Sequence, residues 1–297
     1  MRPRTKVGLD IGTSTVKVLA VSPQKTGGPQ IDFFSVQPVE GERSRESVVN
    51  AVRRAVVSPD TKIQSVTISV SGQSVVVRQV LFPKMSESEL KSALQFEAEK
   101  HIPFNINEVY IDAQVIEQNA EGNKMKVLIV ASKKELAEEY LSYVTGAGLE
   151  ADAIDCDSIA VTNAFLFNNP GLGKDKTVAL LNIGASMTNV CVLKNEMLNF
   201  TRDIPVDVKS LDTLENQVRL SFDYYENQFG KGIDGIFVSG GGAKEEPLLQ
   251  RLKQAFALEV KAWDPMQKLV VSPKVNSEAL KQASEQLAVC VGLAIRR

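Results

Sequence analysis

VGLDIGTSTVKVLAVS, residues 7–22, alternates apolar and polar side chains on either side of a Gly/Ser/Thr turn. This pattern predicts a β-hairpin. A turn of this composition exposes successive backbone N–H groups, admits close approach at Gly12 and adds hydroxyl donors, which together suit a phosphate. The acid before the glycine, Asp10, would face a hydrated divalent cation. A single copy fits an ordinary tight hairpin equally well.

The same pattern recurs in the second half of the chain. LLNIGAS, residues 180–186, aligns with GLDIGTS, residues 8–14, and the two share an acid or its amide, Ile, Gly, and a small residue followed by Ser. An internal repeat of this kind indicates two related structural units. Two copies, each heading one half of the chain, favour a pair of phosphate-binding hairpins over two unrelated turns.

A third glycine-rich element follows later. In VSGGGAKEEPLLQRL, residues 238–252, a β-like run ends, three glycines turn the chain, and a helix begins with Pro247 in its first turn. Backbone at such a triplet can approach a nucleotide base or ribose phosphate closely. The GxGxxG pattern of dinucleotide-binding folds is absent. Because glycine-rich turns between strand and helix are common, this element indicates a nucleotide only together with the two hairpins.

Periodicity and turn residues predict the remaining elements. Before residue 82 they give a ββαβ-type start to a mixed sheet. Residues 82–150 have the order αββα of a compact insertion, and NNPGLGKDK is the best candidate for a linker. The predicted strands are residues 31–36, 65–70, 75–81, 108–117, 125–131 and 235–239, and the predicted helices are residues 44–57, 86–102, 133–147, 157–167, 214–229, 246–256 and 277–295.

Composition excludes several classes of protein. The 297 residues carry 34 Lys+Arg against 36 Asp+Glu, so a large basic face for nucleic acid is not expected. The three cysteines are widely spaced and flanked by apolar residues, which fits a reducing cytoplasm without a disulfide or metal site. The single histidine, His101, excludes a zinc hydrolase. No apolar run approaches the roughly 18 residues that span a bilayer, so direct membrane insertion is not expected.

The two hairpins and the SGGGA turn together resemble the actin-like superfamily, which includes actin, DnaK-type chaperones, sugar kinases and the division protein FtsA. Within it, essentially the whole chain is similar to the PilM family, the cytoplasmic actin-like proteins of type IV pilus assembly. DIGTSTVKV, LQFEAEKHIPFNINEVYIDAQV, KVLIVASKKEL, LLNIGASMTNV and VSGGGAKEEPLLQRL occur in the order typical of that family. EAEKHIPF, residues 97–104, is the most specific of these motifs.

The resemblance implies an α/β, actin-like (ribonuclease H-like) two-lobe fold with an FtsA/PilM-type inserted subdomain. The expected parts are a first lobe (1–82), an inserted αββα subdomain (83–150), a first-lobe helix and linker (151–172), a second lobe lacking most of its small subdomain (173–275) and a C-terminal helix closing on the first lobe (276–297).

PilM-like proteins bind ATP between their two lobes, and the resemblance transfers this site residue by residue. The candidate nucleotide-binding residues are Asp10, Gly12, Thr13, Ser14, Thr15 and Lys17 around the first phosphate loop, Asn182, Gly184, Ala185 and Ser186 around the second, and Gly240, Gly241 and Gly242 in the adenosine turn.

Two departures from the family concern this site. Asn182 replaces an Asp that in relatives helps to hold the metal and order water, so hydrolysis should suffer more than binding. After Pro205 only a short stretch precedes the helix at Leu214, whereas relatives insert a small subdomain that contacts adenine and ribose. We therefore expect ATP and Mg to bind weakly or not at all. No catalytic residue and no metal site is assigned, and the protein is expected to be a scaffold.

The resemblance also implies a partner. PilM-like proteins bind the N-terminal cytoplasmic segment of the inner-membrane protein PilN in a groove between the first lobe and the inserted subdomain. The candidate groove residues are Phe82, Phe96, Ile102, Pro103 and Phe104, although Phe96, Ile102 and Phe104 would equally well seal the inserted subdomain. The expected protein is a cytoplasmic adaptor, peripheral to the inner membrane through a PilN-like partner. Other pilus assembly components are further expected partners, and homo-oligomerisation is left open.

Three alternatives stay open at this point. One is an active, ATP-binding PilM-type ATPase, and another is a sugar-kinase-like enzyme of the same superfamily, which would need a catalytic acid in the cleft and a substrate subdomain. The third is a different adaptor. A division protein like FtsA needs a C-terminal amphipathic membrane helix after a flexible tail, and the type II secretion protein GspL normally continues into a transmembrane helix.

Overall fold

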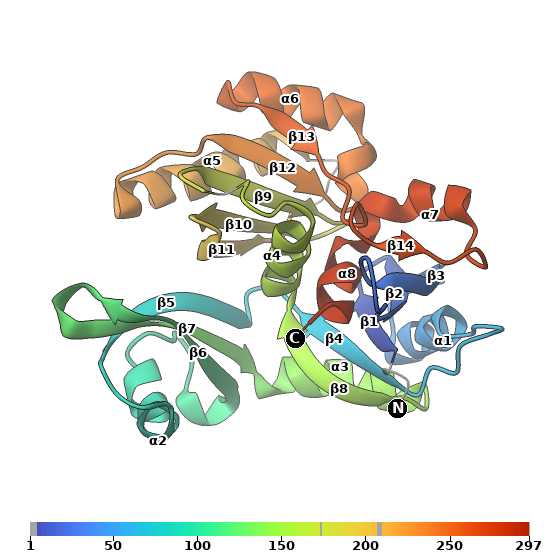
Figure 1. The fold of residues 1–297 in the computed structure, drawn as a ribbon, viewed down its shortest axis with the longest axis horizontal. Coiled ribbons are helices and arrows are strands. Elements are labelled where there is room, and N and C mark those ends of the chain that lie inside the picture. Colours follow the sequence, from blue (N-terminus) through green and yellow to red (C-terminus); the bar gives the residue numbers. More distant parts are fainter. Residues whose placement is uncertain (1–4, 173, 207–209, 297) are drawn as a thin grey trace.

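The computed structural model describes residues 5–172, 174–206 and 210–296 of the 297-residue chain. They form two lobes, each built on one sheet, and a smaller three-stranded part that extends beside the first lobe (Figure 1). In this part of the chain no helix combines the length and the apolar character needed to cross a bilayer.

The first lobe is built on a six-stranded sheet with helices on both faces. In sheet order its strands are β14 (Val270–Val271), β3 (Gln30–Pro38), β2 (Thr15–Ser22), β1 (Lys6–Ile11), β4 (Ser65–Val70) and β8 (Glu150–Cys156). Alternate side chains of a strand point to opposite faces. Val18 therefore packs under α1 (Arg45–Ala55) and α3 (Lys134–Gly146), whereas Leu19 packs with α4 (Asp157–Asn168) and α8 (Ala288–Ala294).

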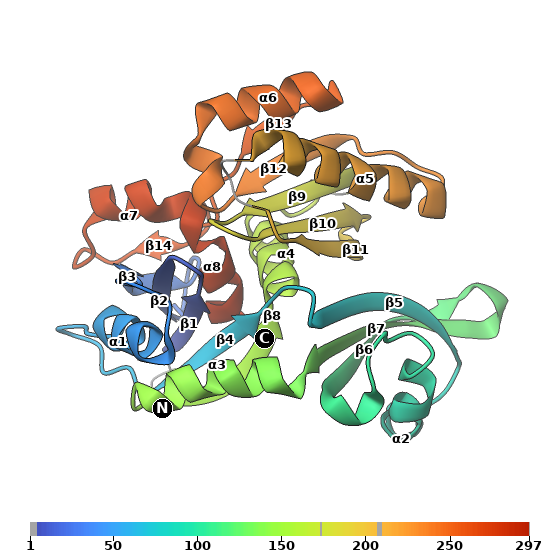
Figure 2. The same ribbon diagram turned by 180° about the vertical axis from the view of Figure 1, so that it is seen from behind.

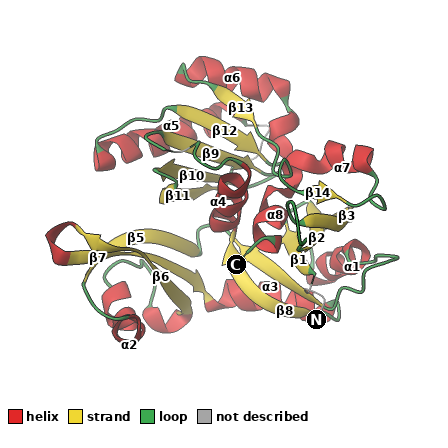
Figure 3. Cartoon of the chain, viewed as in Figure 1, coloured by secondary structure: helices red, strands yellow, loops and turns green. Residues whose placement is uncertain are grey.

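The second lobe is built on a five-stranded sheet that begins with a copy of the opening hairpin. In sheet order its strands are β11 (Met197–Ile204), β10 (Thr188–Lys194), β9 (Thr177–Ile183), β12 (Gly235–Ser239) and β13 (Val260–Ala262). One face packs on α5 (Leu211–Phe229) and α6 (Glu246–Phe256). The other packs on α4, which lies between the two lobes (Figure 3).

The predicted internal repeat is confirmed in the turn hydrogen bonds. The first hairpin closes with the Gly12 N–H donating to Thr15 O at 3.0 Å, and the second closes with the Gly184 N–H donating to Met187 O at 2.9 Å. At either glycine an added Cβ would lie 2.9 Å from that same carbonyl oxygen, so both turns require glycine for the same steric reason.

The inserted part is a three-stranded sheet with one covered face. Its order is β5 (Val75–Pro83), β7 (Lys124–Lys133), β6 (Val109–Ala120). Helix α2 (Glu87–Ala98) packs on the face that carries Phe82, Met125 and Ile129. Figure 2 shows α2 on the side of this sheet that points away from the second lobe. The face opposite α2 therefore looks toward the second lobe.

The expected boundaries of the inserted subdomain, 83–150, are wrong at both ends. β5 pairs with β7 along its whole length, from Val75 opposite Ser132 to Pro83 opposite Lys124, so it belongs to the inserted sheet and not to the first lobe. The helix α3 does not close the insertion, because its Tyr143 and Val144 are buried in the first-lobe core. The inserted unit is therefore βαββ over residues 75–133, and not αββα.

Two further expectations from the sequence fail. β8 was not predicted, although it is the edge strand that pairs in parallel with β4. The single helix expected over residues 277–295 is instead α7 (Ser277–Ala283), a 3₁₀ turn (Ser284–Leu287) and α8. At this break the Ser284 hydroxyl donates to Asp264 at 2.5 Å, and the Glu285 carbonyl accepts the Gly240 N–H at 2.7 Å. These bonds to the second lobe redirect the chain toward the first.

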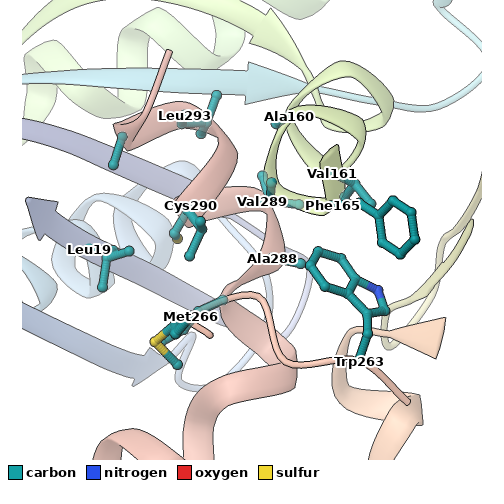
Figure 4. Packing of buried hydrophobic residues seen from close by; sticks show 14 of the residues in the cluster. Leu19, Ala160, Val161, Phe165, Trp263, Met266, Ala288, Val289, Cys290 and Leu293 are labelled. Atoms are coloured by element: carbon teal, nitrogen blue, oxygen red, sulfur yellow. The ribbon is translucent and has the colours of Figure 1, made fainter. Parts of the chain in front are cut away.

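Two glycines allow helix α8 to pack closely between the first-lobe sheet and α4. A Cβ at Gly292 would lie 1.8 Å from the Ala160 carbonyl oxygen, and one at Gly8 would lie 2.2 Å from the Cys290 carbonyl oxygen. Figure 4 shows the α8 side chains between Leu19 of β2 and the side chains of α4. Backbone contact this close joins the end of the chain to its first strand and to the helix between the lobes.

Candidate functional site

A cavity of about 330 Å³ lies between the two lobes. Every candidate nucleotide-binding residue lines it, namely Asp10, Gly12, Thr13, Ser14, Thr15, Lys17, Asn182, Gly184, Ala185, Ser186, Gly240, Gly241 and Gly242. The two hairpins and the glycine turn, far apart in the sequence, are thus brought to one site. Its volume is at the lower end of the range for small-molecule sites.

The two hairpin tips touch one another across this cleft. Thr13 Oγ1 and Ser186 Oγ lie 2.6 Å apart. The first tip is also held from outside the cleft, since Arg43 Nη1 donates to the carbonyl oxygens of Gly12 at 2.8 Å and Thr13 at 3.3 Å. The hydroxyls that would meet a phosphate therefore bind each other in this structure.

The cation in the cleft is already paired. Lys17 Nζ lies 2.8 Å from Asp10 Oδ2, and the two residues are direct cross-strand partners in β1 and β2. Burial lowers the pKa of Lys17, but the charge and hydrogen bond of Asp10, together with the weaker influence of Cys290 and Asp157, raise the pKa above its ordinary value. Lys17 therefore stays protonated, and its charge is paired with that of Asp10. A buried pair of this kind is strongly disrupted when either partner is removed.

Asn182 is used as an amide. Its Nδ2 donates to Asn189 Oδ1 at 2.9 Å, and its Oδ1 accepts the Ser239 hydroxyl at 3.2 Å. A carboxylate at this position would place an acceptor opposite the Asn189 oxygen. Both ends of the Asn182 amide therefore serve the packing of the second lobe.

Sequence reasoning missed several residues that line the cavity, among them Asn189 and Asp157, the first residue of α4. The Ser69 hydroxyl donates to Asp157 Oδ1 at 2.6 Å. Burial, followed by the negative charge of Asp10, raises the pKa of Asp157 to about 7. This carboxyl group can take up or release a proton near neutral pH, and perturbed groups of this kind concentrate at functional sites.

Two of the three glycines in the turn after β12 are required by packing against β9. Gly240 has φ +85°, and its Cβ would lie 2.4 Å from the Ile183 carbonyl oxygen. A Cβ at Gly242 would lie 2.6 Å from the Ile183 side chain. At Gly241 no atom of the described residues lies within 4 Å of the added Cβ. Of the three glycines, Gly241 alone is not required by packing within the described residues.

The candidate groove residues do not line one surface. Phe82 and Ile102 are buried in the core between α2 and the inserted sheet, so their assignment to a groove is wrong. Phe104 packs against the same core, with Lys133 Nζ 5.0 Å from its ring centre. Pro103 is exposed, and Phe96 is 75% exposed on α2. The EAEKHIPF motif mainly seals the inserted subdomain.

The sequence matches the family described as type IV pilus assembly protein PilM over residues 8–207 and 209–297. The chain belongs to the PilM family. The match is interrupted at residue 208, within the short connection, residues 205–210, that joins β11 to α5. The predicted resemblance to PilM-type proteins is thereby confirmed.

Solved structures confirm the fold class. A PilM–PilN type IV pilus biogenesis complex superposes with a TM-score of 0.86 at 22% identity, covering 98% of this chain and 98% of that chain. The ethanolamine utilisation protein EutJ from Carboxydothermus hydrogenoformans gives 0.58 at 12% identity over 99% and 90%. The cytoplasmic domain of EpsL, an inner-membrane component of the Vibrio cholerae type II secretion system, gives 0.51 at 11% identity over 96% and 98%. The chain has the predicted actin-like fold.

Proposed function

We propose that this PilM-family protein is a cytoplasmic adaptor of a type IV pilus, or related secretion, inner-membrane assembly complex. It binds the N-terminal cytoplasmic segment of a PilN-like membrane protein and is peripheral to the membrane through that partner. The observation that carries the proposal is the structural likeness to a PilM chain solved in complex with PilN.

The face of the inserted sheet opposite α2, called the open face below, supports such a docking role where it extends beyond its contact with β11 through Gln79. Phe82 and Ile129 point toward α2, so their neighbours Leu81, Leu128 and Val130 point to the opposite face. Leu81 is 47% exposed, and the other two are partly exposed. A sheet with exposed outer strands can add an extended peptide as a further strand, whose alternate side chains then lie in line with the apolar face. This face, and not the aromatic residues named in the sequence analysis, is the proposed peptide-binding surface.

A peptide-binding experiment tests the adaptor proposal. The N-terminal cytoplasmic peptide of the PilN-like protein encoded in the same genome is titrated into the purified protein and followed calorimetrically. Leu81→Asp places a charge on the open face and should abolish binding. Phe96→Asp places the same charge on exposed α2, on the far side of the sheet, and should leave binding unchanged. Absence of binding by the unsubstituted protein would overturn the adaptor proposal.

We infer further that ATP and Mg bind weakly or not at all. Four features support this: the Asp10–Lys17 pair, the amide role of Asn182, the joined hairpin tips, and the small number of sequence positions between the end of β11 and the start of α5, too few for a further subdomain. Calorimetry with Mg-ATP is the direct test. Micromolar affinity or measurable phosphate release would refute the inference.

One observation favours the alternative of an active ATPase. Asp157 lies in the same cavity as the two hairpins, with a pKa raised to about 7, as expected of a group that accepts a proton during hydrolysis. The two functions separate in one assay. An ATPase should release phosphate at a rate that Asp157→Asn abolishes, whereas the scaffold should release none with either protein. The same assay with a panel of sugars distinguishes a kinase.

A further inference from the structure

A row of polar side chains crosses the sheet of the second lobe. Ser239, Asn182, Asn189 and Asp203 lie on four neighbouring strands, β12, β9, β10 and β11, and each is the direct register partner of the next. Ser239 and Asn189 are almost fully buried. Buried polar side chains nearly always have hydrogen-bond partners. The partners within this row therefore show which side chain donates and which accepts.

The hydrogen bonds of the row all run in one direction. The Ser239 hydroxyl donates to Asn182 at 3.2 Å, Asn182 donates to Asn189 at 2.9 Å, and Asn189 donates to Asp203 Oδ1 at 2.8 Å. The carboxylate at the end accepts only, which fixes the orientation of both amides. Burial raises the pKa of Asp203, and the bonds from Asn189 and Gly72 lower it by less.

The other oxygen of the Asp203 carboxylate accepts a hydrogen bond from outside the second lobe. Asp203 Oδ2 accepts the backbone N–H of Gly72 at 2.6 Å. Gly72, with φ +101°, lies in the loop between β4 of the first-lobe sheet and β5 of the inserted sheet. A second contact lies nearby, where the Gln79 side chain of β5 donates to the Leu198 carbonyl of β11. Asp203 thus holds the joint from which the inserted sheet extends.

The two middle members of the row reach the cleft, because Asn182 and Asn189 both line the cavity. We propose that Asp203 is a positioning residue that fixes the inserted sheet relative to the second lobe, and that the two cleft amides control it through the direction of their hydrogen bonds. Reversing one amide would turn an acceptor toward Asp203 and release Gly72. Such a reversal would give the row two arrangements, as coupling between two sites requires.

The proposal is tested by a distance measurement that needs neither nucleotide nor peptide. Spin labels are attached at Phe96→Cys on α2 and Leu220→Cys on α5, both exposed, while the three native cysteines are buried. The distance distribution between the labels should be narrow in the otherwise unsubstituted protein. Asp203→Ala should broaden it, because the loop at Gly72 is then no longer held and only the Gln79 contact still ties the inserted sheet to β11.

A matched control separates positioning from a general loss of stability. Asp234 also accepts a backbone N–H, that of Thr177 at 2.6 Å, but both residues belong to the second lobe. Asp234→Ala should therefore leave the distribution narrow. An Asp203→Ala distribution as narrow as that of the unsubstituted protein would overturn the proposal.

Two cleft variants test the link through the amides. Asn182→Asp places an acceptor opposite the Asn189 side-chain oxygen. Asn189 must then reverse its amide, which turns this oxygen toward Asp203. The distance distribution should therefore broaden as in Asp203→Ala. Ser239→Ala removes only the first donor, keeps the direction of the remaining bonds, and should leave it narrow. If Asn182→Asp leaves the distribution narrow, the link to the cleft is refuted. A fall of about tenfold in peptide affinity is also expected for Asp203→Ala, a consequence that rests on the proposed function.

Discussion

Thr13 Oγ1 and Ser186 Oγ lie 2.6 Å apart, so the tips of two hairpins that repeat each other in sequence are hydrogen-bonded across the cleft. The lobes are held closed at this point by groups that would otherwise serve a phosphate. The two repeated turns are thus joined to each other by their own side chains.

A cross-link tests whether this contact persists in solution. Because the two oxygens are so close, sulfurs at the same positions should reach the roughly 2.05 Å of a disulfide with little movement. Thr13→Cys/Ser186→Cys should therefore form an intramolecular bond under mild oxidation, seen as faster migration on a non-reducing gel and as loss of two reactive thiols. Each single variant, treated alike, should keep its thiol. A double variant that keeps both thiols would show that the cleft is open in solution.

The buried pair of Asp10 and Lys17 should be strongly coupled in stability. Their side chains are only 12% and 13% exposed. Lys17→Met leaves Asp10 without its partner and should lower the free energy of unfolding by about 3–5 kcal/mol. The double variant Asp10→Asn/Lys17→Met removes both charges and should recover much of this loss. Urea unfolding of Asp10→Asn, Lys17→Met and the double variant measures the coupling between the two side chains. Additive changes in the free energy of unfolding would contradict this coupling.

Asp157 should make stability depend on pH. Its pKa is about 7 in the folded protein against an ordinary 3.8. Between these values the folded protein keeps a proton that the unfolded chain releases, so the free energy of unfolding falls as pH rises through this range and levels off above about pH 7. Asp157→Asn cannot ionise and still accepts the Ser69 hydroxyl bond. The variant should melt several degrees higher than the unsubstituted protein at about pH 8, with little difference near pH 4.

A stability difference of the opposite sign, or one that does not change between these two pH values, would show that Asp157 is not buried with a raised pKa. The prediction also bears on function. A carboxyl group that destabilises the fold at neutral pH is the kind of residue that proteins retain for activity and not for stability.

The cleft was predictable from the sequence because its parts are local. Gly12 and Gly184 are fixed by a clash with their own turn carbonyls, a constraint that stays within a few residues and leaves a visible repeat. Asp157 was missed for a related reason. β8 was not recognised, so nothing placed an acid at the carboxyl end of a strand beside β4, where ligands bind in sheets of this kind.

The inserted subdomain was harder to predict, because adjacency in sequence does not decide packing. Helix α3 follows β7 directly, yet its Tyr143 and Val144 join the first-lobe core. Ile102 is apolar in a distinctive motif, and from the motif alone a core role and a groove role look the same. Only the alternation along β5 separates Phe82, under α2, from Leu81, on the open face.

The contact of α8 with α4 gives the clearest stability prediction. In the middle of a helix, Gly→Ala normally stabilises by up to about 1 kcal/mol. At Gly292, however, the new methyl group would lie 1.8 Å from the Ala160 carbonyl oxygen, a backbone atom that cannot turn aside. Gly292→Ala should therefore destabilise the protein by about 1–3 kcal/mol, with a lower melting temperature. Gly241→Ala is the control, since no atom of the described residues lies within 4 Å of its added Cβ, and it should change stability by less than about 0.5 kcal/mol. Equal melting temperatures for the two variants would mean that α8 does not pack against α4 as closely as the structure shows, and the joint between the lobes would then be looser than the Gly8 and Gly292 contacts require.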